Sequence, residues 1–225
     1  MAATTRRLGA ALAVAAVLGI AELGRRDYRA WIALGEGGIA PGARGWLKVT
    51  ALRLAAADPT DLSRLPAGSA HPRLRNLPWR TGPRPRVGAH PIPHRQLDQE
   101  SPASMVTALD NLFAALLERH APAVVERESG YEKHHPALFA DALQSAGAPP
   151  TGEIAHYHRP QGSMHLHLRP EDARVVIARG WGELHGLSGK AGLPTSYAMI
   201  YAPRDRQELT VIEAILTATI EWATT

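Results

Sequence analysis

Two short segments of alternating polarity, separated by a four-residue turn, constrain the fold of this chain more than any other feature. The segments Glu153 to His158 and Ser163 to Arg169 flank Arg159-Pro160-Gln161-Gly162. Alternation on both sides of a turn that ends in glycine predicts a β-hairpin. Because alternate side chains of a strand share a face, one face should be apolar and buried, and the other should carry histidines.

The histidine face holds His156 and His158 on the first strand and His165 and His167 on the second. If the turn closes symmetrically, we expect His158 opposite His165 and His156 opposite His167. Opposed side chains lie about 5 Å apart at their β-carbons, so these imidazoles would be close enough to share one ligand. Glu153 is expected on the opposite face, unless the strand bulges or ends there.

Three interpretations of this histidine face stay open. In the first, His156, His158 and His165 bind a first-row metal, although the carboxylate of a two-histidine, one-carboxylate iron site is not obvious. In the second, the site is free of metal, one histidine takes a proton, and the others bind the resulting anion. In the third, the face is partly solvated or merely structural.

The rest of the pattern predicts an α+β domain, in which helices pack against a small antiparallel sheet that contains the hairpin. Thr195 to Tyr201 is expected to form a third strand. Ser101 is expected to cap the first of two long amphipathic helices. The four helices expected around the sheet are Ser101 to His120, Pro136 to Ser145, Pro170 to Arg179 and Arg204 to Ala223.

Composition excludes several classes of function. The chain has no cysteine, which excludes disulfides, thiolate zinc sites and cysteine nucleophiles. The formal net charge is +4, but many of the basic residues lie among prolines between His71 and Arg95. A nucleic-acid-binding protein would instead carry a basic helix or sheet face with interleaved aromatics. We therefore expect no nucleic acid partner.

An apolar run near the N-terminus predicts a membrane anchor. Leu8 to Ala21 contains no charged side chain, and arginine pairs flank it at positions 6–7 and 25–26. The run is short enough for a signal-peptide core, but no clean small-x-small cleavage site follows it. We expect an uncleaved single-pass anchor. The slight excess of positive charge on its C-terminal side favours a cytosolic catalytic domain.

The chain is expected to divide into three parts: the anchor (1–26), a membrane-proximal part (27–99) and the catalytic domain (100–225). In the middle part, Asp27 to Leu34 and Gly45 to Leu54 predict two short helices. The proline-rich stretch from Ala57 to Gln99 is too long for an ordinary loop, so we expect it to wrap the domain surface in extended form.

A glycine-tryptophan-glycine turn follows the third of the expected helices. In Gly180-Trp181-Gly182-Glu183-Leu184-His185, the two glycines allow a tight turn that would bring Trp181 and His185 toward the sheet. Trp181 is then either a flat wall for a planar ligand or a core residue. Arg204, just after Tyr201, either holds an anionic ligand or begins the last helix.

Several motifs in a fixed order resemble the fungal luciferase family, over most of the chain after the apolar run. Only the stretch from Ala103 to Pro149 matches poorly. The matching motifs are Arg25-Arg26-Asp27-Tyr28, Leu77-Pro78-Trp79-Arg80, Arg84-Pro85, His90, Gln96 to Gln99, Glu153-Ile154-Ala155-His156-x-His158, His165-Leu166, Gly180-Trp181-Gly182-x-x-His185, Leu187, Tyr201-Ala202-Pro203-Arg204 and the closing helix.

This resemblance implies an oxygenase of the luciferase type. Luminous members oxidise the pyrone 3-hydroxyhispidin with molecular oxygen, lose carbon dioxide and emit light, with no cofactor known to be needed. It implies that His156, His158, His165 and His185 act as base and anion-binding groups, with Glu153 orienting one of them. It also implies substrate contacts from Trp181, Tyr201, Arg204, His90 and His167, although His167 departs from the family pattern. The alternatives are a non-luminous member that is a histidine-ligated metalloenzyme, or a module that binds a small aromatic ligand.

Overall fold

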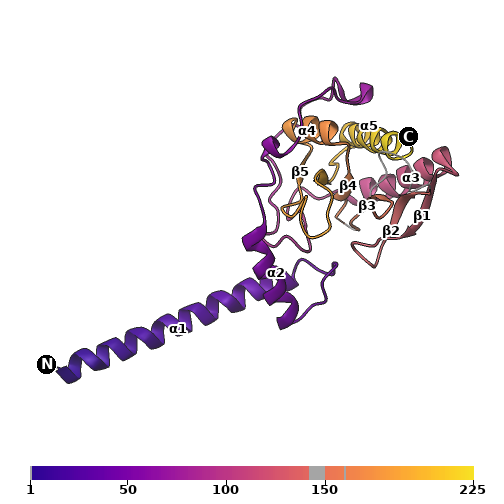
Figure 1. Cartoon of the computed structure of the whole chain (residues 1–225). Helices are drawn as coiled ribbons and strands as arrows, with labels where there is room; N and C mark the ends of the chain where they lie inside the picture. The colour runs from indigo at the N-terminus through magenta and orange to yellow at the C-terminus, as the bar shows by residue number, and fades with distance from the viewer. Residues whose placement is uncertain (1, 142–149, 160) are drawn as a thin grey trace.

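The computed structural model describes residues 2–141, 150–159 and 161–225. Its centre is a six-stranded sheet in the order β1-β2-β3-β4-β6-β5, and every pairing is antiparallel. This arrangement, with helices against the sheet, confirms the α+β prediction (Figure 1). The strands are β1 Val124–Glu128, β2 Pro136–Ala140, β3 Glu153–Tyr157, β4 Met164–His167, β5 Gly182–Leu184 and β6 Tyr197–Ile200.

Three helices cover one face of the sheet and close an aliphatic core (Figure 1). They are α3 (Ala103–His120), α4 (Pro170–Ala178) and α5 (Arg206–Ala223). The Asp205 side chain caps α5 by accepting a hydrogen bond from the Glu208 amide at 2.9 Å. The predicted Ser101 cap on α3 is wrong, because the Ser101 hydroxyl donates instead to the Pro203 carbonyl at 2.8 Å. The helices bury the apolar face of the hairpin and leave the histidine face on the other side.

The hairpin forms, but the predicted register is wrong by two residues. The His158 amide donates to the Ser163 carbonyl at 2.7 Å. The four-residue turn therefore closes with His158 opposite Ser163, and this pair sets the register of the two strands. As a result His156 lies opposite His165. His167 pairs with Tyr197 of β6 instead.

A bulge at the start of β3 changes the direction of Glu153. Phe139 of β2 pairs with Glu153 and Leu138 pairs with Ala155, so Ile154 is the extra residue. An extra residue shifts the alternation by one, which turns Glu153 to the face of His156. Glu153 was expected on the opposite face unless the strand bulged, and the strand does bulge.

The prediction of a helix from Pro136 to Ser145 is wrong over its first half. Pro136–Ala140 forms β2, which lies between β1 and β3 and buries its last four residues. The end of the predicted helix, residues 142–145, lies outside the described residues. An apolar run this short does not distinguish a helix from a buried strand.

The N-terminal part contains two helices, α1 (Ala2–Ile32) and α2 (Ala43–Ala55). The expected helix from Asp27 to Leu34 is the end of α1, which projects from the sheet domain (Figure 1). The indole of Trp31, near that end, donates to the Ile92 carbonyl at 2.9 Å. This contact ties the base of α1 to the proline-rich stretch, which also buries Leu74 and Leu77 in the core. The division of the chain into three parts stays a prediction.

The prediction of a membrane anchor is wrong. Within the described residues, no helix combines the length and the apolar character needed to cross a bilayer. The uncharged run covers residues 8–21. At 1.5 Å per residue it spans about 21 Å, whereas the hydrocarbon core is about 30 Å thick. The single-pass location and the cytosolic side predicted for the catalytic domain both depended on that anchor. Neither prediction is therefore supported.

Gly182 on β5 leaves no room for a side chain. A β-carbon there would lie 2.4 Å from the Met199 carbonyl oxygen. We expect Gly182→Ala to destabilise the fold by about 1–3 kcal/mol, measured as a lower urea midpoint. Gly19→Ala is the control, because an added β-carbon in that helix meets nothing within 4 Å. Equal midpoints for Gly182→Ala and wild type would contradict this packing of β5 on β6.

Candidate functional site

Four side chains converge on one buried point on the histidine face of the sheet. Three are His156, His158 and His165, and the fourth is Glu132 from the β1–β2 loop. Each offers one ligand atom, and these four atoms lie within 4.8 Å of one another. We call this set the histidine–glutamate centre. As a donor set it could hold a metal ion.

The shortest distances in the centre join inward-facing ring nitrogens. His165 Nδ1 lies 3.1 Å from His158 Nε2 and 3.3 Å from His156 Nε2. Glu132 Oε1 lies 3.7 Å from His158 Nε2 and 3.9 Å from His156 Nε2. The hairpin supplies the three imidazoles because its register places His156 opposite His165, with His158 next along the same face.

Polar groups outside the centre hold the outer ring nitrogens of its histidines. His156 Nδ1 lies 2.6 Å from Glu153 Oε1. The Ser129 hydroxyl and the Gly130 amide donate to that carboxylate, at 2.7 and 2.8 Å. His158 Nδ1 lies 2.9 Å from the Ser163 hydroxyl. Because Nδ1 donates to these acceptors, each Nε2 is left with its lone pair pointing into the centre.

A second chain of hydrogen bonds leaves the centre through His165. His165 Nε2 lies 3.2 Å from His94 Nδ1, and His94 Nε2 lies 3.0 Å from Glu183 Oε1. The Tyr201 hydroxyl donates to the other oxygen of Glu183 at 2.8 Å. One buried polar network therefore joins the proline-rich stretch, β4, β5 and the residue that follows β6.

Arg95 neutralises the charge of Glu132. Its guanidinium donates to both carboxylate oxygens, at 3.1 and 2.5 Å, and both side chains are buried. Burial by itself would raise the pKa of Glu132, but the hydrogen bonds and charge of Arg95 outweigh it and lower that pKa. Glu132 is therefore an anion paired with a cation.

Three imidazoles at the site, those of His158, His165 and His185, are neutral at physiological pH. Burial lowers the pKa of His158, His165 and His185 well below the ordinary value of 6.5. The positive charge of Arg95 lowers the pKa of His158 further. Neutral imidazoles offer lone pairs, so the site can accept a proton or ligate a cation.

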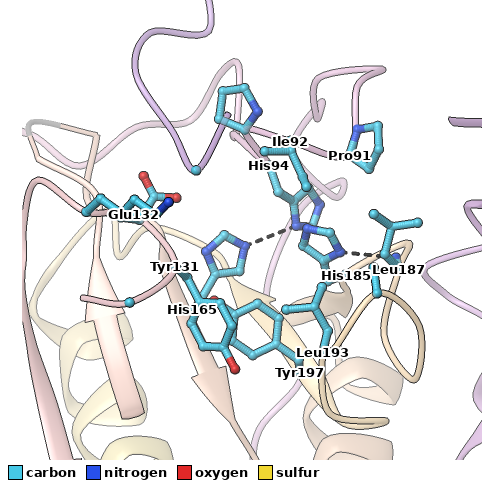
Figure 2. Close-up of a pocket in the computed structure, with 15 residues that line it drawn as sticks. Pro91, Ile92, His94, Tyr131, Glu132, His165, His185, Leu187, Leu193 and Tyr197 are labelled. Carbon is cyan, nitrogen blue, oxygen red and sulfur yellow. Dashed lines mark hydrogen bonds between the residues drawn. The ribbon is translucent and has the colours of Figure 1, made fainter. Parts of the chain in front are cut away.

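A cavity of about 250 Å³ adjoins the centre (Figure 2). Within the centre, only His165 and Glu132 line it, and His156 and His158 lie behind them. The Tyr197 ring lies nearly parallel to that of His165, with centroids 5.1 Å apart and 9° between the planes. The remaining wall is mostly apolar and includes Pro91, Ile92, Leu187 and Leu193. The cavity suits a small planar ligand with a few polar atoms.

The structure brings five of the sequence-predicted site residues to the centre or the cavity. His156, His158 and His165 belong to the centre, Glu153 holds the outer nitrogen of His156, and His185 lines the cavity. His185 differs from the others because its imidazole is hydrogen-bonded to backbone groups. Its Nδ1 accepts from the Leu187 amide at 3.1 Å, and a backbone hydrogen bond to Pro91 raises its pKa against the effect of burial.

The other five predicted residues lie outside the cavity wall. His90 is bonded to Asp27 at 3.0 Å, and Tyr201 reaches the network only through Glu183. The remaining three have structural contacts: the His167 ring packs on Trp222, the Trp181 indole donates to the Pro78 carbonyl inside the core, and Arg204 pairs with Glu208.

Sequence reasoning missed His94, Glu132, Glu183 and Tyr197. The alternation of His90, Ile92 and His94 was a signal for the first, but only His90 was selected. Glu183 lies inside the glycine-tryptophan-glycine motif without a distinguishing pattern. No local signal marks Glu132, because its role depends on how the β1–β2 loop folds over the sheet.

The chain is similar to known fungal proteins. Residues 151–219 match the family model described as the luciferase domain, and this stretch contains the whole histidine hairpin. The chain is 33% identical to the luciferase of Armillaria mellea over 235 residues, covering 95% of this chain and 86% of that protein. It is 30% identical to the luciferase of Neonothopanus nambi over 220 residues, covering 89% and 81%. No solved structure matches the chain. The chain therefore belongs to the fungal luciferase family of enzymes.

Proposed function

We propose that this protein is a luciferase-type oxygenase that oxidises a small electron-rich pyrone or phenol with molecular oxygen. The observation that carries the proposal is the buried wall of neutral imidazoles that faces a mostly apolar cavity. The kinship with proteins named luciferase supports the same reaction type. A pyrone of the 3-hydroxyhispidin type is the substrate we propose, with loss of carbon dioxide and with emission of light.

The chemistry requires an enol bound as its anion, because the anion gives an electron to oxygen far more readily than the neutral enol. The site must therefore stabilise an oxyanion and take up or release its proton. His165 and Glu132 are among the polar groups that line the cavity in which such a ligand would bind. His156 and His158 would support them from behind, and Glu153 would hold His156 in place.

The apolar walls of the cavity would protect the intermediate that forms after oxygen has reacted. A peroxide formed from the pyrone is a high-energy intermediate that water would destroy, so the pocket has to exclude water. Leu187, Leu193 and Ile92 supply an apolar lining for this purpose. We propose that the nearly parallel His165 and Tyr197 rings contact one face of the planar substrate.

Oxygen uptake and photon counting on the full chain test this function. With 3-hydroxyhispidin we expect oxygen consumption that depends on the enzyme, release of carbon dioxide in equal amount, and light. The same mixture under nitrogen and the same pyrone without its 3-hydroxyl group are the controls. No oxygen uptake by a folded sample would overturn the pyrone substrate. Uptake and carbon dioxide without light would keep the oxygenase and overturn light emission.

A further inference from the structure

We propose that the histidine–glutamate centre binds one divalent first-row transition-metal ion. Its ligands would be the Nε2 atoms of His156 and His158, Nδ1 of His165 and a carboxylate oxygen of Glu132. What the ion would do in catalysis rests on the proposed function, but its binding does not.

Two distances among the four ligand atoms match a tetrahedral metal site, and two others are a few tenths of an ångström longer. An ion with metal–nitrogen and metal–oxygen bonds of about 2.0–2.1 Å places its ligand atoms about 3.3 Å apart. The His165 nitrogen lies 3.1 and 3.3 Å from the other two ring nitrogens. The carboxylate oxygen lies 3.7 and 3.9 Å from those two nitrogens. Small side-chain movements would close this set around an ion.

The hydrogen bonds around the centre agree with a metal on every inner nitrogen. Metal-bound histidines usually donate the other ring N–H to a carboxylate or another acceptor. Nδ1 of His156 has Glu153, and Nδ1 of His158 has Ser163. The Ser163 hydroxyl in turn donates to Gln161 at 2.7 Å, which leaves its oxygen free to accept from His158.

His165 also has an acceptor for its outer N–H, and this acceptor is a second histidine, His94. Nε2–H of His165 can donate to Nδ1 of His94, and Nε2–H of His94 can donate to Glu183. In this arrangement each of the four rings carries one N–H, and each of these N–H groups has one acceptor. Without an ion, this same arrangement leaves three nitrogen lone pairs facing one another at the centre. Such lone pairs repel, and a cation resolves the conflict.

Buried carboxylates also surround the centre. Arg95 cancels the charge of Glu132. Two further buried carboxylates, Glu153 and Glu183, are bonded to histidines of this network. A buried carboxylate is expensive unless partners compensate it, and a cation in the centre would add one such partner to this network.

The donor set selects the class of metal. Three imidazoles and one carboxylate suit zinc, iron, cobalt, nickel or copper, whereas calcium and magnesium prefer oxygen ligands alone. Glu132 and His165 also line the cavity, so the ion would stand at its wall. A bound metal ion would supply a Lewis acid that lowers the pKa of an enol hydroxyl in the cavity.

Metal analysis of the full chain tests the proposal. We would purify it without chelator or added ions and measure zinc, iron, manganese, cobalt, nickel and copper by mass spectrometry. About one equivalent per chain is expected for wild type. Glu132→Gln and His156→Ala should each lose most of it. His134→Ala is the matched control, because His134 is exposed in the same loop as Glu132 and should leave the metal content unchanged.

If the variants fold poorly, wild-type protein from which a chelator has removed the metal provides a second test of metal binding. Titration with Zn²⁺ or Co²⁺ should restore one equivalent and raise the melting temperature. A folded wild type that carries no metal and takes none up would overturn the proposal, and so would full metal content in a folded Glu132→Gln, His156→Ala double variant. The readout is independent of turnover. Metal without oxygen uptake would count against the proposed function alone, and oxygen uptake by chelator-stripped protein would overturn only a catalytic role of the ion.

Discussion

Replacing His165 with alanine is expected to lower kcat/KM for the pyrone by about 10²- to 10⁴-fold, the range usual for loss of a group that handles a reacting proton or anion. His165 is the one residue that joins the centre, the chain to Glu183 and the cavity wall. Its loss removes a partner from His156, His158 and His94 at once. Oxygen consumption under saturating oxygen is the measurement.

The fold should survive this change, because the apolar face of the hairpin is untouched. Circular dichroism and a melting curve would establish that His165→Ala is folded. His156→Ala is expected to behave in the same way, whereas His134→Ala should retain full activity. A folded His165→Ala with more than about a third of the wild-type rate would show that turnover does not depend on this imidazole.

Replacing Arg95 with leucine is expected to destabilise the fold by about 3–5 kcal/mol. The side chains of Arg95 and Glu132 are only 9% and 8% exposed, so the substitution leaves a buried carboxylate without its counter-charge. It also removes the hydrogen bond from Arg95 to the Glu36 carbonyl, at 2.8 Å. The free energy of unfolding would be measured by urea denaturation in the presence of a chelator, so that bound metal contributes to neither protein.

Two further variants separate charge burial from simple loss of contacts. Arg127→Leu removes a partner from an ion pair whose side chains are 52% and 55% exposed, and it should cost less than about 1 kcal/mol. The double variant Arg95→Leu, Glu132→Leu buries no charge and should recover most of the stability lost in Arg95→Leu. If Arg95→Leu and Arg127→Leu cost the same, the buried pair is not what holds the β1–β2 loop over the sheet.

Local patterns in the sequence determined the elements that frame the site. The alternation around Arg159–Gly162 predicted the hairpin, because a strand separates neighbouring side chains onto opposite faces whatever lies beyond it. The 3.6-residue periodicity predicted α3 and α5 for the same kind of reason. Three histidines of the centre could therefore be named in advance. Proximity within one hairpin is a local property.

Only the tertiary structure decided which groups complete the centre. The bulge at Ile154 that brings Glu153 to His156 depended on the partner strand β2. Glu132 and His94 arrive from segments outside the hairpin, and their positions follow from the packing of the β1–β2 loop and the proline-rich stretch over the sheet. The sequence also left the role of Trp181 open, because an indole suits either a ligand-binding wall or a hydrophobic core. In the structure Trp181 is buried in the core. Sequence spacing constrains neighbours on one element, but contacts between distant segments depend on the burial and hydrogen bonding of the whole fold.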